Sequence, residues 1–492
     1  ARTNATFTGS PADLMAKAFL VVRRKNDNTT LREKDLATVD RLAGWKVNQL
    51  QLYTEHTFAY RSHREVWAHA SPMTSEEIQE LDGYCRERFI ELVPNQNSFG
   101  HLERWLKFPA YRDLANAPDG FDFKGHPWGP YSLDPCQPAS LTFLSELYNE
   151  LLPNFSSRMF NVGCDETVDL GLARSAEACA ARGVGRVYLD FLLQVHRLVR
   201  EQGRTMQFWG DIIMHHPELV SDLPRDLIAL EWGYEADHPF DRDAAIYAHA
   251  KVPFYVCPGT SSWLSIAGRS SNATANLRNA AEAGVKHGAI GYLTTDWGDQ
   301  GHLQYWPVSW LPMAYGAALS WCTGSNRDLN LAEMASVHVF RDTSGIMGRL
   351  AYELGEASVL TGKTPMNHAA LFDILVAKSG DRKPLDGITS IHLDAAEAAI
   401  DAAIAPLTGA RMDLPDAALV ADEFRNAAAM LRFACRKGRW LLDPSAYRAT
   451  QLAEDLGEII SEHRRLWLAR NRPGGLVDSE RRLGDQLPMF VG

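Results

Sequence analysis

From residue 18 to about residue 300, short apolar runs alternate with longer segments that carry apolar residues at helical spacing. Runs of this length are typical of buried strands, and the longer segments are typical of amphipathic helices. One helix has a start signal of its own, because Thr74 and Glu77 have the spacing of a capping box. The predicted strands are 18–22, 47–53, 89–93, 158–162, 205–209, 227–231, 252–256 and 288–293, and the predicted helices include 32–44, 75–88, 139–151 and 184–202.

Eight strands that alternate with helices are typical of the α/β class and, within it, of a (β/α)8 TIM barrel. An open doubly wound sheet is the alternative, but no Gly-x-Gly-x-x-Gly turn follows the first predicted strand. From about residue 330 strand-like runs become scarce, and Ala-rich helical stretches are predicted at 393–406, 416–437 and 446–470. We therefore predict a lead-in over 1–16, a barrel over 17–328 and a C-terminal α-helical domain over 329–492.

The fourth predicted strand ends in two adjacent carboxylates. The stretch 158–162 has the pattern of a buried strand, and Gly163, Asp165 and Glu166 follow it. Consecutive strand residues face opposite ways, so both carboxylates reach one site only if the chain leaves regular strand geometry there. Gly163 makes such a departure easier. The alternative is that Asp165 caps a helix that begins near Val168.

Polar or aromatic residues follow nearly every predicted strand. Barrel enzymes place their catalytic residues at the C-terminal ends of the strands, so we expect these residues to surround one site. They are Arg23, Arg24, Glu55, His56, Asn95, Asn97, Asp165, Glu166, Trp209, Asp211, Glu231, Trp232, Cys257, Asp296, Trp297 and Asp299.

Carboxylates and tryptophans at a barrel mouth indicate carbohydrate chemistry. Tryptophan faces stack on the apolar faces of pyranose rings, and carboxylates handle hydroxyl groups and the glycosidic oxygen. Trp209, Trp232, Trp263 and Trp297 fall at or just after the ends of strands five to eight. A single tryptophan is more often a packing residue, but four at successive strand ends favour a common aromatic pocket.

The composition narrows the possible partners. The chain has 492 residues, 46% of them hydrophobic, and this is more than one compact domain usually holds. A net charge of −11 argues against nucleic acid and anionic membranes as partners, and no apolar stretch is long enough to span a bilayer. Seven scattered cysteines without a Cys-x-x-Cys pair favour a reducing, cytoplasmic location. Because the chain begins at Ala1, removal of a leader and a secreted or periplasmic location are the alternatives.

Metal catalysis is the weaker chemical alternative. Several histidines are available, but none has His-x-x-x-His spacing. Glu235 and His238 have Glu-x-x-His spacing but run into Pro239, which indicates a loop rather than a ligand-bearing helix. The sequence thus predicts neither a metal nor another cofactor.

Four motifs in the stretch 17–325 resemble glycoside hydrolase family 20, the β-N-acetylhexosaminidases. The family's His-x-Gly-Gly-Asp-Glu at the end of strand four is similar to Asn161-Val-Gly-Cys-Asp-Glu166. Its Pro-Glu-x-Asp-x-Pro-Gly-His after strand three is similar, in length and at both ends, to the stretch from Pro94 to His101. The other two motifs, Thr-Asp with Trp-Arg after strand two and Trp-x-Glu at strand eight, resemble Thr54-Glu55 with Tyr60-Arg61 and Trp297-Gly-Asp299.

The chain also departs from the family pattern. Asn161 stands in place of the family's histidine, Cys164 in place of a glycine, and Asp299 in place of a glutamate. Asn95 and Asn97 stand in place of two acids, so we expect an altered network around His101. These changes indicate a divergent branch.

The resemblance implies a retaining exo-β-N-acetylhexosaminidase that hydrolyses terminal β-linked GlcNAc or GalNAc. In this family the substrate's acetamido oxygen attacks the anomeric carbon and forms an oxazolinium intermediate. Asp165 would orient the acetamido group and offset the positive charge, while Glu166 would act as acid and then base, with its pKa raised by Asp165 beside it. The residues expected to bind the sugar are Arg24, Glu55, His101, Trp209, Glu231, Trp232, Tyr255, Trp263, Trp297 and Asp299.

Two other functions stay open. One is a conventional retaining glycosidase with Glu166 as the acid and Glu231 as a covalent nucleophile, for which the two carboxyl groups should be about 5 Å apart. The other is a non-catalytic carbohydrate-binding barrel. The expected partner is an amino-sugar oligosaccharide or glycoconjugate, without nucleic acid or membrane, and the C-terminal helices are candidates for a homodimer interface.

Overall fold

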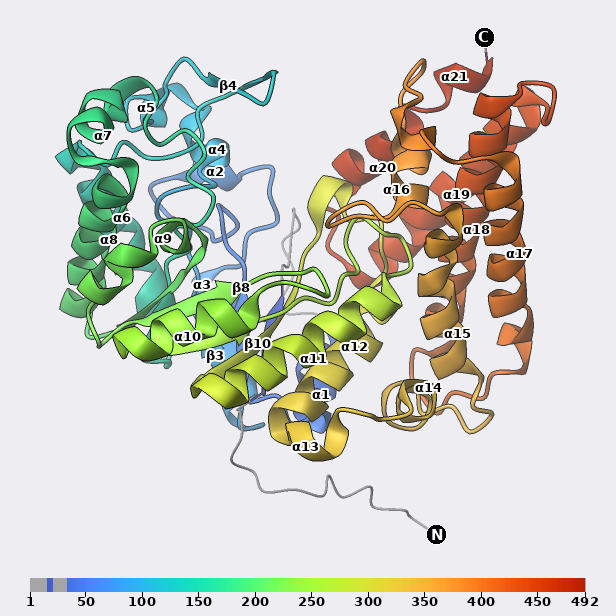
Figure 1. Ribbon diagram of the computed structural model, residues 1–492, viewed down its shortest axis with the longest axis horizontal. Helices are drawn as coiled ribbons and strands as arrows, with labels where there is room; N and C mark the ends of the chain where they lie inside the picture. Colours follow the sequence, from blue (N-terminus) through green and yellow to red (C-terminus); the bar gives the residue numbers. More distant parts are fainter. Residues whose placement is uncertain (1–15, 21–32, 492) are drawn as a thin grey trace.

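Eight parallel strands form one sheet at the centre of the first part of the chain (Figure 1). The computed structural model describes residues 16–20 and 33–491. The order of strands in the sheet is β3-β2-β1-β10-β9-β8-β7-β6. All eight predicted strands are present, with shifted ends in most: β1 (Ala16–Leu20), β2 (Gln49–Leu52), β3 (Glu91–Val93), β6 (Met159–Asn161), β7 (Thr205–Trp209), β8 (Ile228–Trp232), β9 (Phe254–Cys257) and β10 (Gly291–Asp296).

Side chains inside the sheet connect strands that are far apart in this order. Gln51 on β2 donates a hydrogen bond to Gln207 on β7 at 2.8 Å, and Asn161 on β6 donates one to Gln51 at 3.0 Å. In a flat sheet β1, β10, β9 and β8 would separate these partners. A parallel bridge between Asn95 and Asn161 also joins the chain just after β3 to the end of β6. The sheet is therefore strongly curled, with its two edge strands side by side.

Helices cover the outer face of this sheet. The helices predicted near 32–44, 75–88, 139–151 and 184–202 are confirmed, as is the capping box at Thr74 and Glu77, where Thr74 N donates to Glu77 Oε2 at 2.9 Å and Glu77 N to Thr74 Oγ1 at 3.3 Å. The main helices of this part are α1 (Glu33–Gly44), α3 (Ser75–Arg86), α6 (Pro138–Leu151), α8 (Val184–Glu201), α10 (Phe240–Ala250), α11 (Ser270–His287) and α12 (Trp310–Trp321).

The long segment between β3 and α6 contains short ordered elements. They are the one-turn helices α4 (Glu103–Leu106) and α5 (Pro109–Arg112) and a hairpin of β4 (Phe121–Phe123) and β5 (His126–Trp128). Lys124 and Gly125 form the hairpin turn with φ of 54° and 81°. Two consecutive residues with positive φ give the turn that matches the twist of paired strands. Segments this short carry too little periodicity to be predicted.

From Leu331 onward, the elements that the structure describes are helices. The predicted stretches 393–406, 416–437 and 446–470 correspond to α17 (Ser390–Ile404), α18 (Ala417–Leu442) and α19 (Ala449–Arg470). These three helices pack side by side (Figure 1). The other main helices here are α15 (Ile346–Glu356), α16 (Ala370–Val376) and α20 (Leu476–Gly484).

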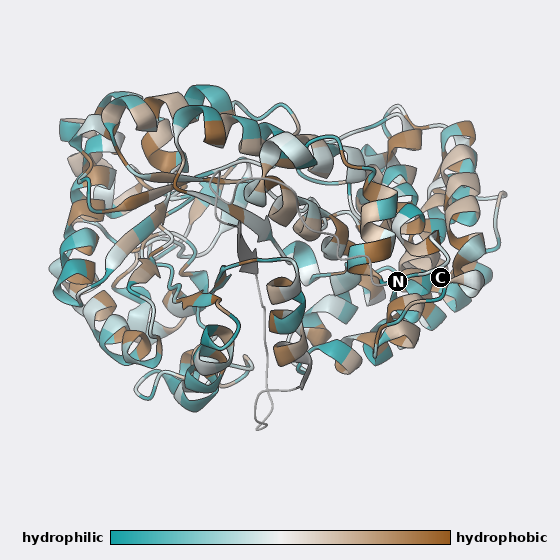
Figure 2. Cartoon of the chain, turned by 90° about the horizontal axis from the view of Figure 1, so that it is seen from below, coloured by the Kyte–Doolittle hydropathy of each residue, from teal (hydrophilic) through white to brown (hydrophobic). Residues whose placement is uncertain are grey.

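The sheet part and the helical part share one hydrophobic core. Phe160 on β6 and Leu431 on α18 belong to the same cluster of buried side chains. Most helices carry both brown hydrophobic and teal hydrophilic positions, as expected when one face of a helix packs on a core (Figure 2). A buried ion pair also joins the two parts, since the Arg472 guanidinium donates to both carboxylate oxygens of Glu77. Within residues 16–20 and 33–491, no helix has the length and apolarity needed to cross a membrane.

Candidate active site

The chain leaves strand geometry directly after β6, as predicted. Gly163, Cys164 and Glu166 have φ of 67°, 69° and 47°, in the left-handed region that side chains rarely adopt. A Cβ added to Gly163 would lie 2.4 Å from Asn97 Oδ1, so both the backbone angle and the space require glycine here. The alternative of a helix from Val168 is wrong, because residues 168–171 form a turn.

These turns bring Asp165 and Glu166 to one side chain, His101. The imidazole Nε2 lies 3.2 Å from Asp165 Oδ2 and 3.4 Å from Glu166 Oε2. The other ring nitrogen, Nδ1, lies 3.0 Å from the Tyr131 hydroxyl. His101 itself has a φ of 60°, and the neighbouring Gly100 leaves room for the backbone, since a Cβ there would lie 2.4 Å from the Asp165 carbonyl oxygen.

The pKa of Glu166 is shifted in the direction opposite to the expected one. Burial lowers the pKa of His101, but the carboxylates of Asp165 and Glu166 outweigh burial and raise that pKa well above its ordinary value. The contact with His101 lowers the pKa of Glu166 by more than burial raises it. The predicted rise in the pKa of Glu166 is therefore wrong, because the nearby cation outweighs the influence expected from Asp165. Both shifts favour a protonated His101 beside an ionised Glu166.

A third acidic residue, Asp211, is hydrogen-bonded to the backbone of this pair. Asp211 is the first residue of α9 (Asp211–Met214), and its Oδ2 accepts a hydrogen bond from the Glu166 backbone N–H at 3.0 Å. Burial and the nearby Asp165 raise the pKa of Asp211 well above its ordinary value. The Oδ1 atom of Asp165 is buried and accepts no hydrogen bond from any residue that the structure describes. The Oδ1 atom of Asp165 is thus available to accept a hydrogen bond from a ligand.

A cavity of about 110 Å³ opens beside the carboxylates. Half of the residues that line it are tyrosine or tryptophan: Trp232 stacks on Tyr234 with ring centres 5.0 Å apart, and Trp297 lies edge-on to Tyr53 at 5.1 Å. The lining residues are Tyr53, Glu55, His101, Asp165, Glu166, Trp209, Trp232, Tyr234, Trp263, Trp297, Asp299 and Asn367. Paired carboxylates beside stacked aromatic faces suit the hydrolysis of a sugar.

Comparison with known families agrees with this geometry. A model described as glycosyl hydrolase family 20, catalytic domain, matches residues 36–283, just over half of the chain. The chain belongs to glycosyl hydrolase family 20.

The family-20 relatives are distant. The stretch similar to hexosaminidase D of Bos taurus is 25% identical over 199 residues and covers 39% of this chain and 55% of that protein. Hexosaminidase D of Homo sapiens is 24% identical over 199 residues, which is 39% of each chain. The matched stretch thus spans about half the length of these relatives or less. Such low identities place the chain in a divergent branch of family 20.

Solved structures of family-20 proteins share the fold. The chitobiase of Flavobacterium johnsoniae superposes with a TM-score of 0.50 at 16% identity and covers 98% of this chain and 78% of its own. A Streptomyces plicatus β-hexosaminidase mutant in complex with GlcNAc gives a TM-score of 0.50 at 18% identity, with 67% and 69% covered.

Two of the asparagines that depart from the family-20 motifs accept hydrogen bonds from the backbone near the strand ends. Asn161 accepts a hydrogen bond from Gly163 N at 2.9 Å through Oδ1, which helps to fix the turn before the carboxylates. Asn95 Oδ1 accepts one from Thr54 N at 2.7 Å. In the network around His101, the Tyr131 hydroxyl contacts Nδ1.

Two described residues that were expected to bind the sugar, Glu231 and Tyr255, are not among those that line the cavity. Arg24 lies outside the described residues. Glu231 is only 3% exposed, because it precedes Trp232 in β8 and consecutive strand residues face opposite sides of the sheet. Tyr255 on β9 is paired in register with Leu230, which comes two residues before Trp232 on β8. Tyr255 therefore lies deeper inside the sheet than Trp232, and its hydroxyl contacts Met159 Sδ at 3.5 Å. Both side chains thus lie outside the cavity lining, and their role in sugar binding stays a prediction.

Three lining residues were not expected from the sequence. Tyr53 ends the second predicted strand, and Tyr234 follows Trp232 at the two-residue spacing that keeps side chains on one face. That alternation could have identified Tyr234. Asn367 comes from the helical part, and nothing in its local sequence indicates the cavity.

One group behind the aromatic wall has the composition of a metal site. Ligand atoms of Glu231, His238 and Asp243 lie within 4.8 Å of one another. Arg242, however, donates to both carboxylate oxygens of Asp243 at 2.7 and 3.2 Å, so this largely exposed guanidinium already balances the charge of Asp243. Burial raises the pKa of Glu231 to about 6. We interpret the group as a buried hydrogen-bonded cluster that supports β8.

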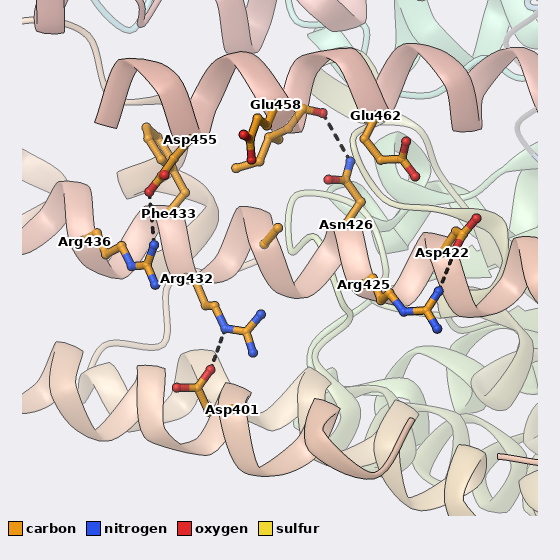
Figure 3. Close-up of a pocket in the computed structure, with 12 residues that line it drawn as sticks. Asp401, Asp422, Arg425, Asn426, Arg432, Phe433, Arg436, Asp455, Glu458 and Glu462 are labelled. Atoms are coloured by element: carbon orange, nitrogen blue, oxygen red, sulfur yellow. Dashed lines mark hydrogen bonds and ion pairs between the residues drawn. The ribbon is translucent and has the colours of Figure 1, made fainter. Parts of the chain in front are cut away.

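The helical part carries a larger cavity of about 590 Å³, but its chemistry does not suit a sugar (Figure 3). Three arginines along α18 point toward acids on the same or neighbouring helices, and the ion pairs are Arg425–Asp422, Arg432–Asp401 and Arg436–Asp455. All three lining arginines are thus engaged in ion pairs, and only one aromatic ring, Phe433, lines the cavity. The smaller cavity at the carboxylates is therefore the candidate active site.

Proposed function

We propose that this protein is a retaining exo-β-N-acetylhexosaminidase that hydrolyses terminal β-linked GlcNAc or GalNAc by substrate-assisted catalysis. We also propose that the curled sheet is a closed (β/α)8 barrel over 17–328, followed by a helical domain over 329–492. The observation that carries the activity is the approach of Asp165 and Glu166 to the same atom, His101 Nε2, within a cavity walled by tryptophans.

Asp165 is suited to hold the substrate's acetamido group. A buried acceptor without a partner is costly, so its Oδ1 favours a ligand that brings an N–H donor. An acetamido N–H bound there would turn the acetamido oxygen toward the anomeric carbon. The carboxylate would then offset the positive charge of the oxazolinium ring that forms when this oxygen attacks and the glycosidic bond breaks.

Glu166 and His101 together hold the proton that the leaving group needs. Half of the Glu166 side chain is exposed, 50% by area, so it can meet the glycosidic oxygen at the cavity mouth. The proton passes from His101 through Glu166 to the leaving oxygen as the bond breaks. Glu166 then takes a proton from the water that opens the oxazolinium ring and restores the starting state. Two groups this close titrate as a pair rather than as separate sites.

The aromatic wall would bind the sugar itself. Trp209 and Trp297 lie 6.2 Å apart between ring centres, and Tyr53 adds a third ring beside Trp297. Aromatic faces of this kind hold the apolar face of a pyranose and the acetamido methyl group. A cavity this small suits one terminal sugar rather than the interior of a chain.

The two competing functions have less support. The conventional two-carboxylate mechanism needs Glu231 at the anomeric carbon, whereas Glu231 is buried outside the cavity lining. A non-catalytic barrel would have no use for a proton shared between His101 and Glu166. A homodimer through the C-terminal helices stays a prediction, to be checked by light scattering.

A paired assay tests the proposed function. Aryl N-acetyl-β-glucosaminide and N-acetyl-β-galactosaminide should be hydrolysed, whereas the plain β-glucoside should not, because only the first two bring the acetamido nucleophile. Equal turnover of the plain glucoside would refute substrate assistance. No turnover of any of the three would favour the binding barrel.

A further inference from the structure

The helical part of the chain reaches into the candidate active site at a single side chain. Asn367 lies in the loop between the short helix η7 (Ala357–Thr361) and α16, and it lines the same cavity as Asp165 and Glu166. The adjacent Met366 is 76% exposed. One residue of this loop therefore faces the cavity while its neighbour faces solvent.

The position of Asn367 is fixed by partners from the sheet part. Its backbone N–H donates to Glu235 Oε1 at 2.7 Å. Glu235 is held in turn by Arg269, which donates to both of its carboxylate oxygens at 3.0 and 2.6 Å. Asn367 has a φ of 66°, a conformation that asparagine tolerates better than most residues. The loop is thus tied to the cavity wall by a charged anchor.

The side-chain amide of Asn367 has a defined orientation. Trp263 Nε1 donates to Asn367 Oδ1 at 3.1 Å, and an indole nitrogen can only donate, so the oxygen must face Trp263. Trp263 is itself wedged in place, since a Cβ on Gly259 would lie 2.5 Å from its ring. The amide Nδ2 is left with two N–H groups, and no side chain or carbonyl within the described ranges accepts from them.

A sugar bound in this cavity needs hydrogen-bond donors for its hydroxyl oxygens. A sugar hydroxyl donates one hydrogen and accepts through its oxygen, whereas ionised carboxylates only accept. The four lining carboxylates, Glu55, Asp165, Glu166 and Asp299, can therefore satisfy hydroxyl hydrogens but not hydroxyl oxygens. Of the four lining indoles, those of Trp263 and Trp297 donate to Asn367 Oδ1 and Tyr234 Oη at 3.1 and 2.8 Å, and the Nε1 atoms of Trp209 and Trp232 are buried in the wall.

We infer that Asn367 is a substrate-binding residue, supplied by the helical part, whose amide donates to a hydroxyl oxygen of the bound amino sugar. This inference rests on the proposed function for the identity of the sugar. It gives the helical part a direct role in affinity for the substrate, because the binding pocket is complete only when the loop before α16 is docked.

The decisive variant is Asn367→Asp, which has nearly the same shape. Aspartate keeps an oxygen for Trp263 and tolerates the left-handed backbone, but it replaces the two N–H donors with an acceptor. We expect KM for the aryl N-acetyl-β-glucosaminide to rise roughly tenfold or more, because a carboxylate oxygen then faces the hydroxyl oxygen. The value of kcat should stay within about threefold, since this contact is made equally in the ground state and the transition state.

Two further variants separate binding from support of the wall. Asn367→Gly keeps the left-handed backbone and removes the whole side chain, so it should raise KM as well. Met366→Ala changes the exposed neighbour and should keep wild-type kinetics. If Asn367→Asp has wild-type KM, or loses kcat at unchanged KM, the inference is overturned, whatever the glycine variant does.

Calorimetry keeps this test independent of catalysis. Wild type and Asn367→Asp are titrated with N-acetylglucosamine, N-acetylgalactosamine and glucose, and each melting temperature is measured to confirm folding. Roughly tenfold weaker binding of a sugar by the variant supports the inference even if the wild type hydrolyses no glycoside and the proposed function fails. Equal dissociation constants in the two proteins, or no sugar binding by the wild type, would overturn it.

Discussion

The charge of Asp165 can be removed while its shape is retained. In the substrate-assisted mechanism, the variant Asp165→Asn loses the carboxylate that offsets the oxazolinium charge. For charges about 4 Å apart and an effective dielectric constant of about 20, the interaction is worth about 4 kcal/mol. A loss of that size in the transition state lowers kcat roughly a thousandfold. Asp165 is only 7% exposed, so solvent screens little of this interaction.

The neighbouring histidine changes the protonation of the variant. His101 lies 3.2 Å from Asp165 Oδ2, and this carboxylate is one of the groups that raise its pKa. In Asp165→Asn the pKa of His101 should fall, and the proton that Glu166 delivers should be held less tightly. The kinetics of the variant should therefore be compared with wild type at the pH optimum of each protein.

A thiazoline that mimics the oxazolinium ring gives an independent measure of the same interaction. Such a compound should bind wild type far more tightly than the product sugar, because the site is shaped for the intermediate. Asp165→Asn should lose thiazoline affinity and kcat on an aryl N-acetyl-β-glucosaminide by similar factors. Glu231→Gln, at a residue outside the cavity, serves as the control and should leave the chemistry largely intact.

Two results would refute this reasoning. One is a thiazoline that binds Asp165→Asn as tightly as it binds wild type, since the carboxylate would then contribute nothing to the charged state. The other is a covalent adduct on Glu231, trapped with a fluorosugar and detected by mass spectrometry. Such an adduct would establish an enzyme nucleophile and exclude the substrate-assisted route.

Three further variants test other parts of the site. Glu166→Gln should lower kcat by about 10²- to 10⁴-fold on substrates with poor leaving groups and by less on activated aryl substrates, and equal loss on both would contradict its role as the acid. Trp297→Ala should weaken N-acetyl substrates by about 2 kcal/mol through lost contacts with Tyr53 and Trp209, measured as kcat/KM. His101→Gln removes the group whose raised pKa keeps the shared proton bound at high pH. The alkaline limb of the plot of kcat/KM against pH should therefore move to lower pH. An unmoved limb would contradict a proton shared with Glu166.

Most of the architecture follows from local patterns in the sequence. The strand 205–209 has the boundaries of β7, and Thr74 with Glu77 marks the start of α3, because buried strands and capped helices have short-range signals. The hairpin at Lys124 and Gly125 escaped prediction, since its strands have only three residues each. Tertiary contacts, not local propensity, hold segments of this length.

The site was predictable only as far as strand ends determine it. Asp165 and Glu166 follow β6 in the sequence, and their meeting depends on the turn at Gly163. The direction of the pKa shift of Glu166 depends on His101, a contact across 65 residues that no local pattern reveals. Asn367 reaches the cavity from a different part of the chain, so its role is visible only in three dimensions.

The buried pair of Glu77 and Arg472 sets an order of events during synthesis. Glu77 leaves the ribosome 395 residues before its partner. At about 5 to 20 residues per second, this interval is roughly 20 to 80 s. Until Arg472 arrives, the carboxylate on α3 can be buried only at the cost of an unpaired charge, so water must keep access to this helix. Full burial of Glu77 on α3 therefore has to wait until Arg472 has been synthesised.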